Sequence, residues 1–276
     1  MSGRPEHRAP PEIFYNEDEA RKYTRNTRMI EIQMTMSERA VELLGLPEDQ
    51  PCHLLDLGCG SGLSGEFLSE QGHTWVGVDI SDAMLNVAKE KEVEGDVALV
   101  DLGQGLPFRA GAFDGAISIS ALQWLCNADK TSHNPAKRLN KLFSTLYSCL
   151  SLGSRAVFQF YPENSAQMEL ITSQSMKAGF SGGIVVDYPN STKAKKYFLV
   201  LMTTSSATKP DPFGQTSLFE QVGFSGFTHD AFDERHVLPQ TGAPPSGDHT
   251  SIFLKNSRSF GHGDAILEHM KYELSK

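Results

Sequence analysis

Short apolar runs alternate with amphipathic stretches through the middle of the chain, a pattern typical of α/β proteins. Most of the apolar runs are too hydrophobic to be half-exposed, so they predict strands of a parallel sheet that is covered on both faces. Strands are expected at residues 53–57, 74–80, 97–100, 113–120, 155–161, 184–188 and 197–202, and helices between them at 63–71, 82–92, 135–150 and 165–178. The pattern predicts a Rossmann-like, seven-stranded and mostly parallel sheet with helices on both faces.

The two ends of the chain lack this alternation. Residues 1–12 are polar and rich in proline, which predicts a flexible leader. Residues 13–50 predict an N-terminal helical extension, as one long helix or two shorter ones that begin after Asn16 and end before Gly45. Thr, Ser, Gly and Pro cluster in residues 203–276, which predicts an irregular and partly disordered tail after a central domain at 51–202.

Composition narrows the range of partners. The net charge of −9 argues against wrapping nucleic acid by bulk electrostatics, because neutralising phosphates requires clustered Lys and Arg. Any RNA contact must be local, and two small basic stretches, at 21–28 and 193–196, could supply it. The four cysteines are scattered, so no metal site is expected. No apolar run approaches the ~20 residues of a membrane span, and no signal-peptide core is visible, so we expect a protein inside the cell without membrane contact.

Glycines follow the first expected strand and mark a ligand site. Gly58, Gly60 and Gly62 allow a tight turn in which a ligand can approach the main chain where a helix begins. The spacing alone leaves the ligand open, because Gly60-x-Gly62-x-x-Gly65 also fits the dinucleotide fingerprint, with Asp79 nineteen residues after Gly60.

Acidic residues near these glycines resemble those of the class I S-adenosylmethionine-dependent methyltransferases. Asp56 precedes the glycines, and the matching acid of that superfamily helps to hold the methionine end of the cofactor. Asp79 ends the second strand, where a carboxylate can accept both ribose hydroxyls. Asp101 and Leu102 follow the third strand, from which the superfamily commonly contacts adenine. The resemblance implies S-adenosyl-L-methionine as cofactor, with a nicotinamide-dependent enzyme as the alternative. The residues expected to bind the cofactor are Asp56, Gly58, Cys59, Gly60, Gly62, Asp79, Ile80, Asp101, Leu102 and Ser118.

The segment after the fourth strand bears on the methyl acceptor. Residues 118–129 contain neither the Asn/Asp-Pro-Pro-aromatic tetrapeptide used for exocyclic amino groups nor a Pro-Cys pair for cytosine C5. Guanine N7 would fit, because its in-plane lone pair carries no proton and needs no general base, so that positioning supplies the catalysis. Trp124 and Tyr161 are candidates for stacking on the base, and Gln123 or Asn127 for reading its edge. A core role for Trp124 is equally consistent with its apolar surroundings.

Beyond the superfamily, the chain resembles the eukaryotic guanine-N7 methyltransferases of small-subunit ribosomal RNA. The matching blocks are residues 11–15, 19–29, 55–65, 117–129 and 156–163. The resemblance implies methylation of one guanosine in 18S rRNA during 40S maturation, in the nucleus (nucleolus and nucleoplasm) and the cytoplasm. It also implies a heterodimer with a small zinc-binding activator subunit, placed along the sheet edge near the third strand. The family usually ends in a strongly basic tail, whereas residues 203–276 are net acidic.

Two other functions remain compatible with the sequence. The acidic net charge favours a methyltransferase for a small molecule. A ribosome-assembly factor that acts mainly by binding is the alternative from a different class.

Overall fold

The structure is a computed structural model that describes residues 4–191 and 194–204. The expectations for the tail beyond residue 204 lie outside the described residues. The first strand of the central domain begins at His53, and the last described strand ends at Met202.

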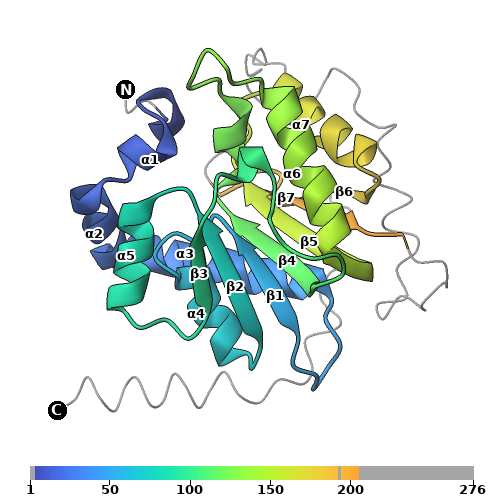
Figure 1. Ribbon diagram of the computed structural model, residues 1–276, viewed down its shortest axis with the longest axis horizontal. Helices are drawn as coiled ribbons and strands as arrows, with labels where there is room; N and C mark the ends of the chain where they lie inside the picture. Colours follow the sequence, from blue (N-terminus) through green and yellow to red (C-terminus); the bar gives the residue numbers. More distant parts are fainter. Residues whose placement is uncertain (1–3, 192–193, 205–276) are drawn as a thin grey trace, which may run out of the picture. The chain divides into compact units, whose positions relative to one another are not determined.

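Seven strands of the described chain pair into one sheet, namely β1 (His53–Leu57), β2 (Thr74–Asp79), β3 (Asp96–Leu99), β4 (Phe113–Ile119), β5 (Leu150–Phe160), β6 (Ser181–Asp187) and β7 (Lys196–Met202). Their order across the sheet is β3-β2-β1-β4-β5-β7-β6 (Figure 1). The first five pair in parallel, and β7 runs antiparallel to both β5 and β6. The predicted seven-stranded, mostly parallel sheet is confirmed.

Helices pack on both faces of this sheet. The α-helices are α1 (Pro11–Phe14), α2 (Glu17–Arg25), α3 (Thr27–Leu44), α4 (Leu63–Glu70), α5 (Asp82–Glu90), α6 (Pro135–Cys149) and α7 (Ser165–Lys177), and the 3-10 helices are η1 (Pro5–His7), η2 (Leu102–Gln104) and η3 (Leu122–Cys126). Helices α3 and α4 bury Met36 and Leu68 against Leu54 of β1, whereas α6 buries Phe143 against the face that carries Leu55. Successive strand residues therefore face opposite cores. Within the described residues, no helix has both the length and the apolar character needed to cross a membrane.

The strand order reverses at β1, and this reversal positions the site. From β1 the chain builds outward to β2 and β3 on one side, and it then crosses to β4 and β5 on the other side. The loops that leave the carboxyl ends of β1 and β4 therefore diverge, and ligands of open α/β sheets bind in the crevice between such loops.

The N-terminal extension consists of separate helices because Asn26 interrupts it. The Asn26 side chain accepts a hydrogen bond from the Met29 backbone N–H and so caps α3, while its own extended backbone ends α2. Gly45, with φ of +58°, ends α3. The sequence was compatible with one long helix or with two shorter ones. The structure has two between Asn16 and Gly45, namely α2 and α3.

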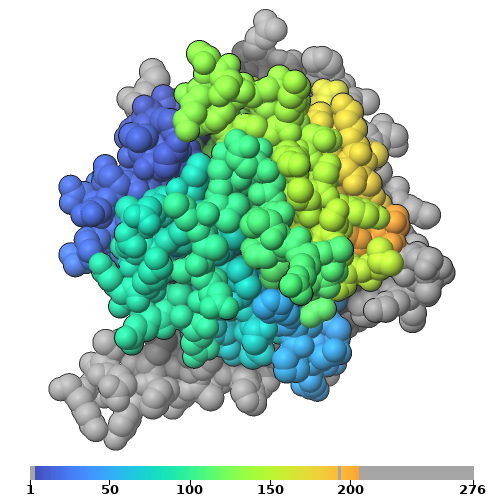
Figure 2. Space-filling view, in the orientation of Figure 1, coloured from blue at the N-terminus to red at the C-terminus, as the bar shows by residue number. Residues whose placement is uncertain are grey.

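Residues 4–12, expected as part of a flexible leader, instead lie against the domain. Arg4 donates to the backbone carbonyls of Tyr161 and Pro162, both at 2.9 Å, and Glu6 is buried. Figure 2 shows the N-terminal residues in blue, directly against the teal surface of α5, where Arg21 pairs with Glu90 at 2.7 Å. A polar composition cannot reveal such contacts, because they are made with residues far along the chain.

Strand β5 begins earlier than the sequence predicted. The apolar run starts at residue 155, whereas the strand starts at Leu150, which pairs with Phe113. The register between β4 and β5 shifts after this pair, and residues 152 and 153 are exposed. The register shift and the exposed residues 152 and 153 separate buried Leu150 from the apolar run that follows, so the pattern does not mark it as part of the strand.

Candidate active site

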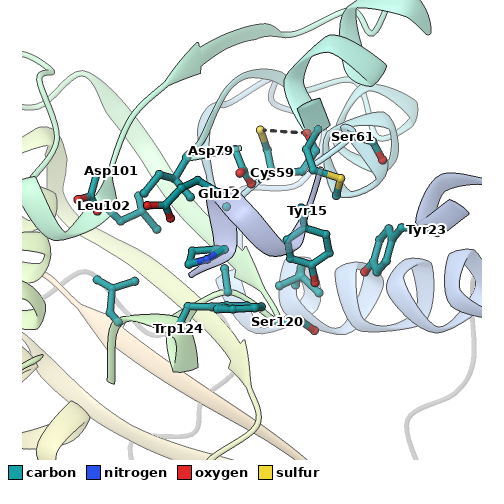
Figure 3. A pocket seen from close by; sticks show the side chains of 18 of the residues that line it. Glu12, Tyr15, Tyr23, Cys59, Ser61, Asp79, Asp101, Leu102, Ser120 and Trp124 are labelled. Carbon is teal, nitrogen blue, oxygen red and sulfur yellow. Dashed lines mark hydrogen bonds between the residues drawn. The ribbon is translucent and has the colours of Figure 1, made fainter. Parts of the chain in front are cut away.

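A pocket lies over the carboxyl ends of β1, β2 and β4, where the strand order predicts a crevice. Figure 3 shows Asp79 and Cys59 on one side of it and Trp124 on the opposite side, with Tyr15 and Tyr23 from the N-terminal helices. Eight of the residues expected at the site line this pocket: Gly58, Cys59, Gly60, Asp79, Ile80, Asp101, Leu102 and Trp124.

The turn between β1 and α4 requires glycine at two positions that line the pocket. Gly58 has φ of +77° and Gly60 has φ of +55°, a region that residues with a Cβ rarely adopt. A Cβ at Gly58 would overlap Ala121, and one at Gly60 would lie 2.9 Å from Met84 Cε. Gly62 is not among the lining residues and instead caps the start of α4. Glycine at these two positions therefore lets Ala121 and Met84 pack against the turn, while both glycines line the pocket.

The Asp79 carboxylate joins the ends of β1 and β2. One oxygen accepts the Gly60 backbone N–H at 2.9 Å, and the other accepts the Ser81 backbone N–H at 2.8 Å. Burial raises the pKa of Asp79, and these backbone hydrogen bonds oppose that rise. Each carboxylate oxygen has a second lone pair, so both remain able to accept a hydrogen bond from a ligand.

Asp101 and Leu102 form the wall of the pocket after β3. Asp101 caps η2 by accepting the Gly103 backbone N–H at 2.9 Å. The same oxygen accepts a hydrogen bond from Arg138 of α6 at 2.6 Å. Leu102 is buried beside it. The third strand therefore supplies a carboxylate that is held in place from two sides.

Trp124 is packed among apolar side chains and also lines the pocket. Its side chain is 7% exposed, and its ring lies 5.9 Å from Phe14 and 5.8 Å from Tyr15 between centroids. It also lines the pocket. The tryptophan thus joins the N-terminal helices to η3 and presents part of its surface to a ligand.

Gln123 and Tyr161, expected to position a base, do not line this pocket. The Gln123 amide donates to the Ser120 carbonyl at 2.7 Å, and its oxygen accepts from the Tyr161 backbone N–H at 3.5 Å. The Tyr161 hydroxyl donates to Met36 Sδ at 3.4 Å. In this structure, both side chains lie behind the pocket wall.

The N-terminal helices contribute lining residues that the search for chemical motifs missed. Tyr15 and Tyr23 contact each other edge to face at 5.9 Å, and burial raises the pKa of Tyr15 to about 12. The Tyr15 carbonyl accepts from Ser81 Oγ at 2.8 Å. Glu12 pairs at 3.3 Å with Lys130, which also lines the pocket. The available signal was the matching blocks at residues 11–15 and 19–29, which carry no motif of their own.

Comparisons with known proteins agree with this geometry. Residues 55–157 match the protein family described as "Methyltransferase domain". An 18S rRNA (guanine-N(7))-methyltransferase from Mus musculus is 60% identical over 227 residues, which cover 82% of this chain and 81% of the relative. A relative of the same description from Arabidopsis thaliana is 67% identical over 202 residues, 73% of this chain and 70% of the relative. The chain belongs to the 18S rRNA (guanine-N(7))-methyltransferase family.

A further member of this family aligns through the tail. The probable 18S rRNA (guanine-N(7))-methyltransferase from Dictyostelium discoideum is 59% identical over 276 residues, which cover 98% of this chain and 96% of that relative. Most of the acidic segment after residue 202 is therefore included in that alignment.

The fold is also found in a solved methyltransferase. The structure of phosphoethanolamine N-methyltransferase 2 from Haemonchus contortus, in complex with phosphomonomethylethanolamine and S-adenosylhomocysteine, superimposes with a TM-score of 0.52. The match has 18% identity and covers 69% of this chain and 58% of that one. This match supports the Rossmann-like fold that the sequence predicted for this chain.

Asp56 and Ser118, both expected at the cofactor, lie behind the glycine turn. Ser118 Oγ donates to the Leu57 carbonyl at 2.7 Å. Asp56 is fully buried, and one of its oxygens accepts from Ser64 Oγ at 2.6 Å. Its other oxygen, Oδ1, has no hydrogen-bond partner within the part of the chain described. Burial raises the pKa of Asp56 to about 7, although the Ser64 hydrogen bond opposes the rise.

We expect the free energy of unfolding of this protein to depend on pH because of Asp56. Its folded pKa of about 7 exceeds the ordinary 3.8, so between these values the folded chain holds a proton that the unfolded chain has released. The free energy of unfolding therefore falls as the pH rises through this window, by roughly 1.4 kcal/mol per pH unit. Asp56→Asn removes this contribution, so the variant should gain stability relative to wild type between about pH 5 and pH 7.

Denaturant unfolding of the ligand-free protein at several pH values measures this effect. Asp82→Asn is the matched control, because Asp82 is exposed on α5. If the difference between Asp56→Asn and wild type does not change with pH, the buried carboxyl group does not titrate in this range.

Proposed function

We propose that this protein transfers the methyl group of S-adenosylmethionine to N7 of a guanosine in 18S rRNA during assembly of the 40S subunit. The observation that carries the proposal is its membership of the guanine-N7 methyltransferase family at 54–67% identity to relatives so described. The pocket supports it, because residues that match the superfamily's motifs line the pocket or lie directly behind it. The sequence alternative of a nicotinamide-dependent enzyme has no such support.

The residues present fit S-adenosylmethionine. Gly58 and Gly60 line the pocket, and the Asp79 carboxylate has acceptor lone pairs besides those that the Gly60 and Ser81 backbone N–H groups use, as ribose hydroxyls require. Ser61 Oγ is buried without a partner among the described residues, which suits a site completed by a polar ligand. When bound, the cofactor supplies an electrophilic methyl group on a sulfonium.

Each expected cofactor residue has a proposed task that follows from its position. Asp79 holds the ribose, while Asp101 and Leu102 hold adenine. Cys59 and Ile80 complete the wall, and Gly62 starts the helix that the turn enters. Asp56 and Ser118 act from behind the turn, where they fix the backbone that faces the methionine end of the cofactor.

Positioning of the guanine requires no proton transfer to the enzyme before attack, since N7 carries a lone pair and no proton. We propose that Trp124, together with Tyr15, supplies an aromatic wall for the base. Gln123 and Tyr161 would then act indirectly, because their hydrogen bonds fix η3 and the end of β5 behind Trp124. Stacking of a base on an aromatic side chain contributes about 1–3 kcal/mol.

The deciding experiment is a methylation assay. Incubation of the protein and its activator with immature small subunits and labelled S-adenosylmethionine should place label at N7 of one guanosine in 18S rRNA. Gly60→Glu is the negative control, because its side chain would project beside Met84 into the pocket. Label on a metabolite instead of RNA would favour a small-molecule enzyme. If Gly60→Glu abolishes cofactor binding but pre-rRNA processing continues, an assembly role that depends on binding is favoured.

We expect Asp79→Ala to weaken binding of S-adenosylhomocysteine by about 1–3 kcal/mol, because hydrogen bonds to a charged group are lost. Titration calorimetry measures the affinity, and the melting temperature of the ligand-free variant reports any loosening of the turn. Asp82→Ala is the control, since Asp82 is exposed three residues further along. An unchanged affinity for Asp79→Ala would remove Asp79 from the ribose site.

For the partner, we propose that the small zinc-binding activator covers the β3 edge of the sheet. Among the described strands, β3 ends the strand order and pairs with β2 alone. Leu99 on this edge is 60% exposed. An uncovered edge with an exposed leucine invites pairing with another chain.

Methylation of 18S rRNA implies action in the nucleus, and we propose that the protein acts in the nucleolus, the nucleoplasm and the cytoplasm.

Leu99→Asp should reduce the yield of the heterodimer on co-expression, because it places a charge in the apolar part of the proposed contact. Leu152→Asp is the matched control, since Leu152 is 65% exposed but lies on β5. Size-exclusion chromatography of the co-expressed chains measures the complex. If both variants lose the complex equally, or if neither variant loses it, the activator does not bind at β3.

A further inference from the structure

Arg138 occupies an unusual place beside the pocket. It lies on α6, yet it lines the pocket, and its side chain is only 11% exposed. Its Nη2 donates to Asp101 Oδ1 at 2.6 Å, and its Nη1 donates to the ring of His133. Its Nε is buried without a hydrogen-bond partner within the described chain. Buried polar groups are normally hydrogen-bonded, so the contacts with Asp101 and His133, and not contact with solvent, determine the position of this guanidinium.

The two oxygens of Asp101 are in different situations. Oδ1 accepts both the Gly103 backbone N–H and the Arg138 guanidinium. Oδ2 makes none of the hydrogen bonds found among the described residues, and the side chain is 23% exposed at the pocket wall. The ion pair therefore occupies one oxygen and leaves the other as a free acceptor. Figure 3 shows Asp101 with Leu102 at one end of the pocket.

Gly103 leaves the room that this arrangement needs. A Cβ at Gly103 would overlap Arg138 Nε and would lie 2.6 Å from both Cζ and Nη2. Gly103 also donates its backbone N–H to Asp101. Gly103 thus holds the Asp101 carboxylate with its backbone N–H. Because it has no side chain, it also leaves room for the Arg138 guanidinium, which donates to the same carboxylate.

We infer that Arg138 is a positioning residue for the cofactor: it fixes Asp101 so that Oδ2 accepts the exocyclic amino group of adenine, and so sets the preference for adenine over purines without that group. The inference rests on the proposed function, since it assigns adenine to this end of the pocket. The carboxylate touches the ligand and the guanidinium does not. Because the short hydrogen bond from Arg138 holds the Asp101 carboxylate in one orientation, its free oxygen stays directed at a donor.

The test compares two ligands. One is S-adenosylhomocysteine, and the other is its analogue with hydrogen in place of the amino group at purine C6. Titration calorimetry gives the ratio of their dissociation constants for each protein. The wild-type ratio should be at least about tenfold, because a hydrogen bond to a charged group is lost with the analogue.

Three variants separate positioning from folding. Arg138→Gln removes the charge, and Gly103→Ala keeps both side chains but displaces the guanidinium. We expect the ratio to fall at least about threefold below the wild-type ratio in both, since the guanidinium no longer holds Asp101 and only the backbone N–H of residue 103 does. Arg138→Lys keeps the charge and should give an intermediate ratio. Lys137→Gln is the control, because Lys137 is the exposed neighbour on the same helix, and it should retain the wild-type ratio.

Each outcome decides a different point. If the variants bind both ligands more weakly but keep the wild-type ratio, Arg138 only anchors α6, and the inference is overturned. If Arg138→Gln does not fold, Gly103→Ala and Arg138→Lys still give the ratio. If wild type binds neither ligand, the proposed function itself fails. If wild type binds both ligands equally, adenine recognition does not depend on Asp101, and the inference again fails.

Discussion

The hydrogen bonds of the Asp79 carboxylate are the interaction on which the rest of the site depends. They join the glycine turn after β1 to the turn after β2, through Gly60 on one side and Ser81 on the other. Ser81 in turn holds the carbonyl of Tyr15, so the same residue also anchors the N-terminal helices. Asp79 therefore joins two adjacent strand ends, and Ser81 joins them to the segment that covers them. Burial raises the pKa of Asp79, and the backbone N–H groups that donate to its carboxylate oppose this rise.

The helices before β1 complete the pocket. A Rossmann-like sheet supplies the glycine turn and the acids after β2 and β3, but these form one side of a crevice that is open to solvent. Tyr15 and Tyr23 supply another wall, and the Glu12–Lys130 ion pair links α1 to the segment after η3. Closing the site with residues from before the first strand lowers access of water to the reacting atoms, which strengthens electrostatic contacts inside.

The sequence predicted those parts of the protein that are encoded by local pattern. The strands and the helices between them follow from hydrophobic periodicity, and Gly58, Gly60 and Asp79 follow from a motif in which spacing and chemistry are linked. Arg4 and Tyr15 could not be placed in this way, because their contacts with Pro162 and Ser81 join residues that are far apart along the chain. That Gln123 and Tyr161 lie outside the pocket lining could not be predicted for a related reason. A residue close to a strand end faces the ligand or the core according to its backbone geometry, and composition does not distinguish the two.

The charge of the described surface explains how an acidic protein can act on RNA. Some basic side chains are paired with acids, as in Arg138 with Asp101 at the pocket and Arg21 with Glu90. Other exposed cations have no ion pair within the described part of the chain, and Arg8, Arg25, Arg28 and Arg109 are among them. Unpaired cations of this kind contribute a short-range and salt-sensitive attraction to phosphates. Under the proposed function, the aromatic pocket selects the base, and contacts supplied by the particle or by the proposed partner subunit provide the encounter. The net negative charge of the chain is then compatible with an RNA substrate, because bulk attraction to phosphates is not what selects the guanosine.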